Sequence, residues 1–345
     1  MRTDRNVPTL QILPPPPPEK EGWPWTKETS SILDRYPDDY DWPVISIVTP
    51  SFNQGKFIEE TIRSVLLQGY PNLEYIVIDG GSNDNSLDII RKYEPWISYW
   101  ISEPDRGQSH AINKGLKRAT GTILAWLNSD DLLQSNTLYF VAKTLTQKTN
   151  PAWLIGASAI IDRDSKISHY RYPNKIEFEN LLNWHENWFP QQSTFWNYLM
   201  WQSVNPLDEN LHYVMDFALW LAMIQKAKPI TTQTVLSCYR YQPDAKCMKN
   251  AFKVWYELFN CLIEVYPKIK KENFKSNLVY PFLTLANIFC FYEKYTMALK
   301  CLQFSYQQNL LFGLNIKNLI LLGKILIKIL IGKNKYQTAR DFLKP

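Results

Sequence analysis

The sequence lacks most features of secreted, membrane-spanning or zinc-binding proteins. Its five cysteines are odd in number and include no CxxC pair, which fits reduced thiols better than a disulfide framework or a zinc site. The opening MRTDRNVPTLQ has no apolar signal-peptide core, and no uncharged run is long enough to span a bilayer. We therefore expect a cytoplasmic protein.

Strong net charge and phosphate-binding glycine loops are also missing. A formal charge of +5 over 345 residues is far from the basic stripe of a nucleic-acid-binding protein, so we expect no nucleic-acid partner. No GxGxxG or Walker A loop follows the first apolar run. That absence argues against a dinucleotide oxidoreductase and weakens the case for a nucleotidyltransferase.

What is present suggests a large domain with an appendage, since 45% of the residues are hydrophobic. Residues 1–40 form a polar, proline-rich arm, expected to be extended or disordered and to stay outside the core. Residues 41–245 contain short apolar runs that alternate with helical patterns. Residues 250–345 read as almost entirely helical.

The alternating runs predict an α/β fold. Strands are expected in four continuous apolar runs, at 44–49, 75–79, 99–102 and 123–128. Between them, apolar residues recur with helical spacing, as in Ile58, Ile62, Val65 and Leu66. We expect a Rossmann-like, mostly parallel sheet with helices on both faces, which binds ligands beyond the carboxyl ends of its strands.

Polar residues follow every one of these predicted strands. The four loops are 50–53, 79–84, 103–108 and 128–131, and in a parallel sheet they should converge. The last loop contains two adjacent acids, Asp130 and Asp131. They could cap the helix suggested by LLQSNTLYFVAKTL, or hold a divalent cation and its phosphate ligand. The expected convergence favours the cation.

Two segments resemble the catalytic domain of the family 2 inverting glycosyltransferases, enzymes of the GT-A fold that transfer a sugar from a nucleotide diphosphate. They are ISIVTPSFNQGKFIEETIRSVLLQGYPNLEYIVIDGGSNDNS and SEPDRGQSHAINKGLKRATGTILAWLNSDDLL. The resemblance covers about residues 44–140 and continues more loosely to about 242. It places the helical region outside the family domain.

The resemblance implies a role for each matching position. Pro50, Ser51 and Asn53 would wrap the base and ribose of the nucleotide, Asp79 would shape the base pocket, and Asp105, Gly107 and Asn113 would border the diphosphate and donor sugar. Asn128, Asp130 and Asp131 match the DXD-type motif, in which Asp130 and then Asp131 would bind Mg²⁺ or Mn²⁺. Asp216 would be the catalytic base.

Four positions depart from the family pattern: Asn128 replaces an acid, Gly80 follows Asp79 in place of a second acid, and His110 and Gln242 stand where relatives often carry Asp and His. Simpler alternatives stay open. Asp79 could bond the amides of its own turn. Asp216 could be a solvated helix acid.

Other side chains also have two interpretations. Arg106 and Arg240 could neutralise diphosphate or form ordinary ion pairs, and Gln191 and Gln192 could line an acceptor cleft. In the helical region, 285–310 has the spacing of a helical hairpin. The lysine-bearing 313–335 could be a buried helix with a solvated stripe or an interfacial helix in peripheral contact with the inner face of the membrane.

The predicted function is metal-dependent, inverting transfer of a sugar from a nucleotide-diphospho-sugar donor to a glycan or lipid-linked acceptor, in cell-surface or extracellular polysaccharide synthesis. The alternatives are a non-catalytic scaffold that binds a nucleotide sugar, and a nucleotidyltransferase on a similar sheet.

Overall fold

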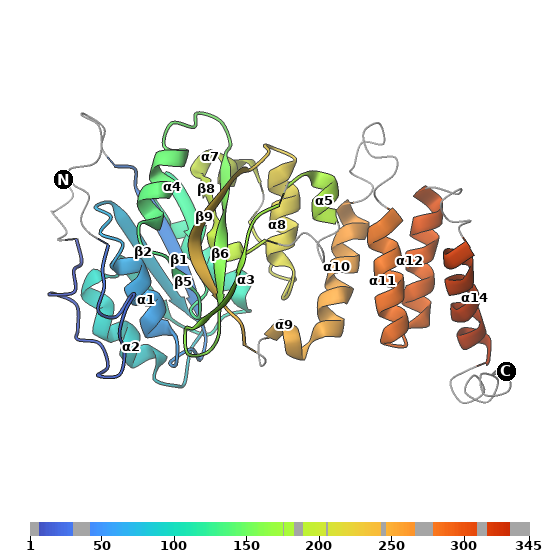
Figure 1. The fold of residues 1–345 in the computed structure, drawn as a ribbon, viewed down its shortest axis with the longest axis horizontal. Helices are drawn as coiled ribbons and strands as arrows, with labels where there is room; N and C mark the ends of the chain where they lie inside the picture. The colour runs from blue at the N-terminus through green and yellow to red at the C-terminus, as the bar shows by residue number, and fades with distance from the viewer. Residues whose placement is uncertain are drawn as a thin grey trace. The chain divides into compact units, whose positions relative to one another are not determined.

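The computed structural model of the protein describes residues 7–29, 42–174, 176–182, 189–204, 206–242, 246–265, 279–308 and 316–331. The chain divides into two compact units, Met1–Glu177 with Trp188–Ala245 and Phe178–Asn187 with Lys246–Pro345. The first unit holds a β-sheet flanked by helices, and the described part of the second unit is helical (Figure 1).

A nine-stranded mixed sheet forms the centre of the first unit. Its order is β3-β2-β1-β4-β8-β6-β9-β5, and β7 pairs with β6 beside this path. The strands are β1 (Ile45–Ser51), β2 (Leu73–Asp79), β3 (Tyr99–Ser102), β4 (Ile123–Trp126), β5 (Leu132–Leu133), β6 (Trp153–Ile161), β7 (Ile167–Arg171), β8 (Thr194–Asn197) and β9 (Ile230–Arg240). The four predicted strands are all present and pair in parallel as β3-β2-β1-β4.

The rest of the sheet contains both antiparallel and parallel pairs. Strands β6 and β9 pair in parallel. Strand β8 pairs antiparallel with β4 and β6, β7 pairs antiparallel with β6, and β5 pairs antiparallel with β9. For β6 and β7 the cause is local, because only the five residues 162–166 connect them. A link of that length makes a hairpin and is too short for a parallel crossover.

Helices cover both faces of β1, as predicted. The helices and 3-10 turns of this unit are α1 (Ile58–Leu66), α2 (Ser86–Tyr93), η1 (Glu94–Trp96), α3 (Gln108–Arg118), α4 (Thr137–Leu145), η2 (Gln191–Ser193), α7 (Tyr198–Ser203) and α8 (Met215–Ile224). Ile47 shares a buried cluster with Ile62 of α1. Val48, the next residue, points to the other face, where a Cβ on Gly115 of α3 would lie 2.3 Å from Val48 Cγ1. Glycine is required there by this close approach.

The acids at 130 and 131 do not cap a helix. The short strand β5 follows them, and α4 begins only at Thr137, with Asn136 as its N-cap residue. The capping alternative is therefore wrong, and another cause is needed for two adjacent carboxyls at this position.

The proline-rich segment packs on the first unit. Arg63 of α1 is fully buried and donates to the carbonyl oxygens of Pro14, Pro24 and Trp25, at 2.7, 3.1 and 2.9 Å. Proline lacks an amide hydrogen but keeps its carbonyl, so such a segment can satisfy a buried guanidinium. The prediction that the arm stays outside the core is wrong for residues 7–29. Residues 1–6 and 30–41 lie outside the described residues.

The second unit contains α5 (Phe178–Leu182), α9 (Lys246–Lys249), α10 (Ala251–Val265), α11 (Val279–Phe291), α12 (Tyr295–Gln308) and α14 (Ile316–Ile331). Helices α11 and α12 form the predicted hairpin, with Phe282 stacked on Phe304 at a ring-centroid distance of 5.4 Å. Lys328 of α14 donates to the Tyr295 hydroxyl at 2.9 Å.

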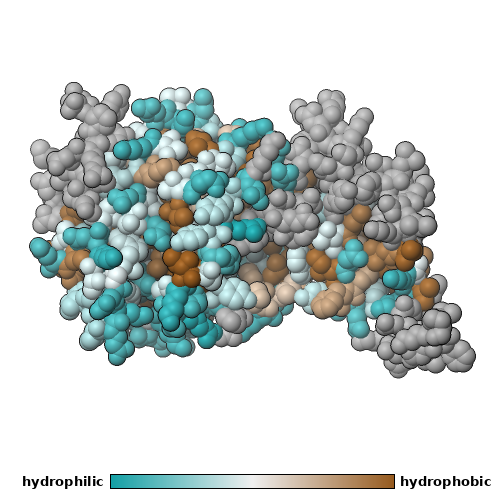
Figure 2. Space-filling model, in the orientation of Figure 1, coloured by the Kyte–Doolittle hydropathy of each residue, from teal (hydrophilic) through white to brown (hydrophobic). Residues whose placement is uncertain are grey.

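Much apolar surface stays uncovered on the second unit. Figure 2 shows hydrophobic surface, in brown, over its helices. On α14, four apolar side chains are exposed, namely Ile320, Leu326, Ile327 and Ile329. Within the described parts of the chain, no helix combines the length and hydropathy needed to cross a membrane.

Candidate active site

The carboxyl ends of β1, β2 and β3 bring polar residues into register. Ser51 pairs with Asp79, and Asp79 pairs with Ser102. Beyond the strands, the backbone amide of Asn53 donates to Ser82 Oγ at 2.8 Å, so the first two loops are joined directly. This confirms that the loops after the parallel strands meet at one edge of the sheet.

The first loop presents an unused polar group. The Ser51 hydroxyl is buried and has no hydrogen-bond partner among the described residues. A buried hydroxyl in that state is costly unless a ligand or water satisfies it. Pro50 beside it is buried within β1. Asn53 has a left-handed backbone (φ 52°), and its Oδ1 accepts from the Asn83 amide at 2.9 Å.

The Asp79 carboxylate is committed to its own turn. It is fully buried and accepts from the amides of Gly81 and Ser82 at 3.0 and 2.8 Å and from the Ser102 hydroxyl at 2.7 Å. These bonds are those of the simpler alternative, in which Asp79 bonds neighbouring backbone amides. Any effect of Asp79 on a bound base would therefore pass through the turn that it holds.

The third loop packs closely on the second. Asp105 Oδ1 accepts from the Gly107 amide at 2.8 Å, and a Cβ on Gly80 would lie only 2.6 Å from Asp105 Oδ2. An acid at position 80 would therefore displace the Asp105 side chain, which gives a physical reason for the glycine. Gly107 itself has φ 119°, a conformation that favours glycine, and lies beside the ring of His212.

The two acids after β4 have different surroundings. Both Asp131 oxygens are bonded by the protein, Oδ1 by the Arg240 amide at 2.9 Å and Oδ2 by the Asn128 side chain at 3.1 Å. Asp130 is half-buried and its Oδ2 accepts from Gln242 at 2.8 Å. No donor in the described parts of the chain reaches Asp130 Oδ1. Only Asp130 therefore offers a free oxygen, which departs from the prediction that Asp131 binds the metal directly.

Burial makes two neighbouring negative charges costly in this loop. Burial raises the pKa of Asp130, although the bond from Gln242 opposes the shift. The pKa of Asp131 lies well above its usual range because of burial and then because of the charge on Asp130. A cation beside Asp130 would relieve this repulsion.

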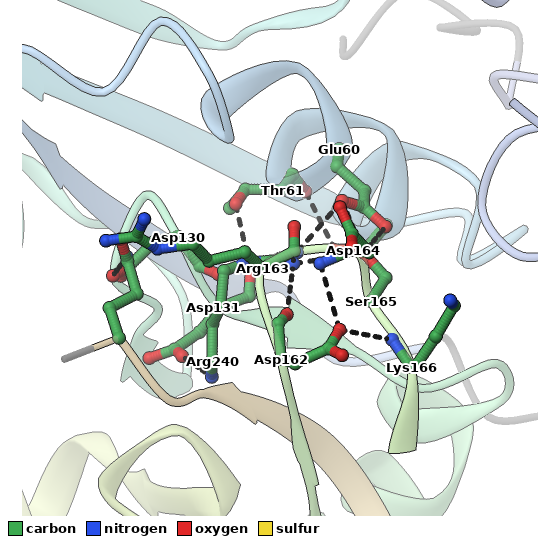
Figure 3. Close-up of polar contacts among 12 residues, drawn as sticks. Glu60, Thr61, Asp130, Asp131, Asp162, Arg163, Asp164, Ser165, Lys166 and Arg240 are labelled. Atoms are coloured by element: carbon green, nitrogen blue, oxygen red, sulfur yellow. Dashed lines mark hydrogen bonds and ion pairs between the residues drawn. The ribbon is translucent and has the colours of Figure 1, made fainter. Parts of the chain in front are cut away.

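Arg240 of β9 joins the acid loop to two other segments (Figure 3). Its Nε donates to the Asp130 carbonyl at 2.8 Å, and its Nη2 lies 2.9 Å from Glu60 Oε2 in a fully desolvated ion pair. Nη1 donates to the Asp162 carbonyl and to Ser165 Oγ, both at 3.0 Å. All these partners are protein groups, so Arg240 forms an ordinary ion pair and backbone contacts, which is the second of its two interpretations. Arg106 likewise forms an ion pair with Glu209.

Asp216 lies in the first turn of α8. Burial raises its pKa to about 6, and the Phe217 amide, which donates to Oδ1 at 2.8 Å, only partly opposes this shift. Trp220, one turn further on, stacks on Trp126 of β4 with ring centroids 5.6 Å apart and planes at 5°. The helix that carries Asp216 is thus packed against the strand that leads to the acid loop.

Two glutamines connect to the same loop. Gln108 Nε2 donates to Asn128 Oδ1 at 2.8 Å. Gln191 Oε1 accepts from Asn128 Nδ2 at 3.4 Å, and Gln191 Nε2 donates to the Trp126 carbonyl of β4 at 2.9 Å. Gln192 is buried and bonded to Ser158. The side chains of Gln191 and Gln192 are thus buried and bonded to protein groups.

Comparison with known proteins identifies the sheet unit. Residues 46–201 match the profile of "Glycosyl transferase family 2". The sheet unit is therefore similar to the family 2 glycosyltransferases. Over 144 residues the chain is 39% identical to TuaG of Bacillus subtilis, a putative teichuronic acid biosynthesis glycosyltransferase. The aligned residues make up 41% of this chain and 57% of that protein.

Two further similarities are informative. WfgD of Escherichia coli, a UDP-Glc:alpha-D-GlcNAc-diphosphoundecaprenol beta-1,3-glucosyltransferase, is 34% identical over 146 residues, which are 42% of this chain and 56% of that protein. The mannosyltransferase PcManGT from Pyrobaculum calidifontis, in complex with GDP-Man and Mn²⁺, superposes with a TM-score of 0.53 at 19% identity and covers 85% of this chain and 83% of that one. The last likeness concerns the GT-A fold alone. The chain spans little more than half of TuaG and WfgD.

The sheet unit offers few protein ligands for a divalent cation. No group of three or more His, Cys, Asp or Glu side chains in the described residues is arranged to bind a metal. Burial raises the pKa of Asp130. Its free Oδ1 fits a cation that takes its remaining ligands from phosphate and water. Among the two acids of the loop after β4, Asp130 is therefore the residue that could hold a divalent cation.

Glu60 and Gln108 of the sheet unit were not among the predicted site residues. Glu60 lies on a predicted helix and Gln108 ends the predicted loop 103–108, and neither differs in its local pattern from a solvated residue. Glu60 becomes distinctive only because Arg240, 180 residues later, is buried against it.

Proposed function

We propose that the protein transfers a sugar, with inversion, from a nucleotide diphosphate to a hydroxyl of a glycan or lipid-linked acceptor. The observation that carries this proposal is the pair of carboxyls with different surroundings, Asp130 with a free oxygen and Asp216 with a pKa raised to about 6. They stand on a strand end and a helix that are packed together through Trp126 and Trp220.

The donor side of the reaction is assigned to the joined loops. Pro50, Ser51 and Asn53 hold the base and ribose, and the unpartnered Ser51 hydroxyl is a donor or acceptor available to the nucleotide. Asp79, Asp105, Gly107 and Asn128 hold these loops in shape around the diphosphate. WfgD uses a UDP-sugar and PcManGT binds a GDP-sugar, so these are the first two donor classes to test.

Asp130 would hold Mg²⁺ or Mn²⁺ against the diphosphate. When bound, such a cation stabilises the negative charge that develops on the leaving phosphate. Asp131 supports Asp130 by pinning the loop to Arg240 and Asn128.

Asp216 is assigned as the base that takes the proton of the acceptor hydroxyl. A base works best when its pKa lies close to the working pH without exceeding it, and burial brings Asp216 toward that range. Attack from the side opposite the leaving diphosphate is a single displacement, which inverts the anomeric carbon.

The test is turnover of UDP-glucose, UDP-N-acetylglucosamine and GDP-mannose with Mn²⁺, measured as release of the nucleoside diphosphate. Asp216→Asn should lower turnover of the accepted donor by about a hundredfold or more while nucleotide binding is retained. Asp88→Asn, at an exposed position of α2, is the matched control. Full turnover by Asp216→Asn would place the base elsewhere.

The proposed setting is cell-surface or extracellular polysaccharide synthesis, as the names of TuaG and WfgD suggest. We also propose that α14 contacts an anionic membrane surface. It exposes Lys324 among the apolar residues Ile320 and Ile327, and it contains no acidic residue. The side chains of Lys317 and Lys335 lie outside the described residues.

A further inference from the structure

Helix α3 holds the segment that leads to α8. The Asn113 side chain donates from Nδ2 to the Leu207 carbonyl at 2.8 Å and accepts from the Leu207 amide at 3.0 Å. One turn earlier, Ser109 Oγ donates to the Leu211 carbonyl at 2.9 Å. Residues four apart share one face of a helix, so this face of α3 fixes both ends of 207–211.

This segment controls the entry of the chain into α8. The helix begins at Met215 with Val214 as its N-cap residue, and no side chain caps it. Local sequence therefore fixes the start of α8 only weakly. The body of the helix is fixed through Trp220, which stacks on Trp126 and Trp153. The first turn, which carries Asp216, is anchored by the buried side chains of Met215 and Phe217 and by the segment before it.

The same end of α3 reaches the acid loop. Gln108 Nε2 donates to Asn128 Oδ1 at 2.8 Å, and Asn128 in turn bonds Asp131. Gln108 and Ser109 are consecutive residues, so one turn of helix contacts both the loop of Asp130 and the segment before Asp216. The separation of these two carboxyls is thus tied to α3.

We propose that Ser109 and Asn113 are positioning residues, which hold segment 207–211 and thereby set the place of Asp216 relative to the acid loop. The proposal rests on the proposed function, in which Asp216 is the base. It differs from the role that the family resemblance implies for Asn113, a border of the diphosphate and donor sugar. The Asn113 amide is already satisfied on both its oxygen and its nitrogen by the Leu207 backbone.

The two roles predict opposite kinetics. Loss of a donor contact weakens ground-state binding and raises KM for the nucleotide sugar, whereas misplacement of a base lowers kcat. A shift of about 1 Å in a catalytic group can cost on the order of a hundredfold in rate. We expect Asn113→Ala and Ser109→Ala each to lower kcat by about tenfold, with KM and the Kd for the nucleoside diphosphate changed by less than about twofold.

The experiment compares Ser109→Ala, Asn113→Ala and two references in the full chain, with the nucleotide sugar of the panel above that is turned over and with Mn²⁺. Asn72→Ala is the matched control, since the Asn72 amide also bonds a backbone carbonyl, that of Trp42, but precedes the amino end of β2, away from the site. Asp216→Asn reports whether the base is correctly assigned.

Lower kcat in both α3 variants, with unchanged Kd and a normal Asn72→Ala, supports the proposal. A rise in KM with normal kcat for Asn113→Ala would overturn it in favour of the donor contact. An equal loss of kcat in Asn72→Ala would overturn it in favour of general destabilisation. Full turnover by Asp216→Asn would instead refute the base assignment itself. If Asn113→Ala does not fold, Ser109→Ala decides alone, because it removes a single bond.

Discussion

Replacement of Glu60 by glutamine tests whether the buried ion pair with Arg240 supports the acid loop. Glu60 and Arg240 have side-chain exposures of 6% and 0%, and their charged atoms are 2.9 Å apart. Ser165 also donates to both Glu60 oxygens, at 2.7 and 3.0 Å. The substitution keeps an acceptor oxygen but removes the negative charge.

The expected cost follows from what Arg240 retains. Breaking a buried ion pair by removing one partner costs about 3–5 kcal/mol. Glutamine can still accept one bond from Arg240, and Asp130 and Asp131 remain near its charge, so we expect the lower end, about 3 kcal/mol. In a unit of this size, each kcal/mol lowers Tm by about 2–4 °C. Glu60→Gln should therefore lower Tm by about 6–12 °C.

Thermal unfolding followed by circular dichroism measures this shift. The matched control is Asp88→Asn, which breaks the Arg91–Asp88 pair, whose side chains are 58% and 80% exposed. Exposed pairs contribute about 0–1 kcal/mol, so the control should move Tm by no more than about 4 °C. Equal shifts in the two variants would refute the view that the Glu60 charge stabilises Arg240.

Three further predictions concern pH and the membrane. Because Asp216 must be deprotonated to act, turnover should fall as the pH drops below about 6, and the same limb should be missing from the residual activity of Asp216→Asn. The folded-state pKa of Asp216, about 6, exceeds its ordinary value of 3.8, so its stabilising contribution is complete below pH 3.8 and is lost as the pH rises through 6. Asp216→Asn should therefore raise Tm more at pH 8 than at pH 4. Equal changes in Tm at the two pH values would show that the folded-state pKa of Asp216 is not raised. The double variant Ile320→Asp, Ile327→Asp on α14 should abolish sedimentation of the protein with vesicles that contain anionic lipid. Tyr198→Asp, at an exposed position of the sheet unit, should leave sedimentation unchanged. Unchanged sedimentation of the α14 variant would rule out this helix as the membrane contact.

The sequence was sufficient for the parallel half of the sheet and its helices. Continuous apolar runs mark strands buried on both faces, as for β1, and spacing by three and four residues marks α1, because both patterns are set by the local geometry of the chain. The convergence of the strand-end loops also followed, since it depends only on strand direction.

The long-range contacts that hold the site in place could not be predicted from the local sequence. Arg240 and Glu60 are 180 residues apart, and Asn113 and Leu207 are 94 apart. Such partners are chosen by tertiary packing, and a polar residue on a helix gives no local sign of whether it meets solvent or a distant backbone. The N-terminal segment shows the same limit, because its prolines exclude helix and strand but not the carbonyl contacts to Arg63.

Asp130 is proposed to make nucleotide binding depend on a divalent cation. Calorimetric titration of the protein with UDP, GDP and dTDP, with and without Mn²⁺, measures this dependence, with Asp130→Asn as the comparison. We expect one nucleotide to bind only in the presence of Mn²⁺, and we expect Asp130→Asn to lose this dependence together with most of the affinity. Binding at full strength without metal would refute the role of Asp130, and a folded protein that binds none of the three nucleotides would refute the nucleotide site itself.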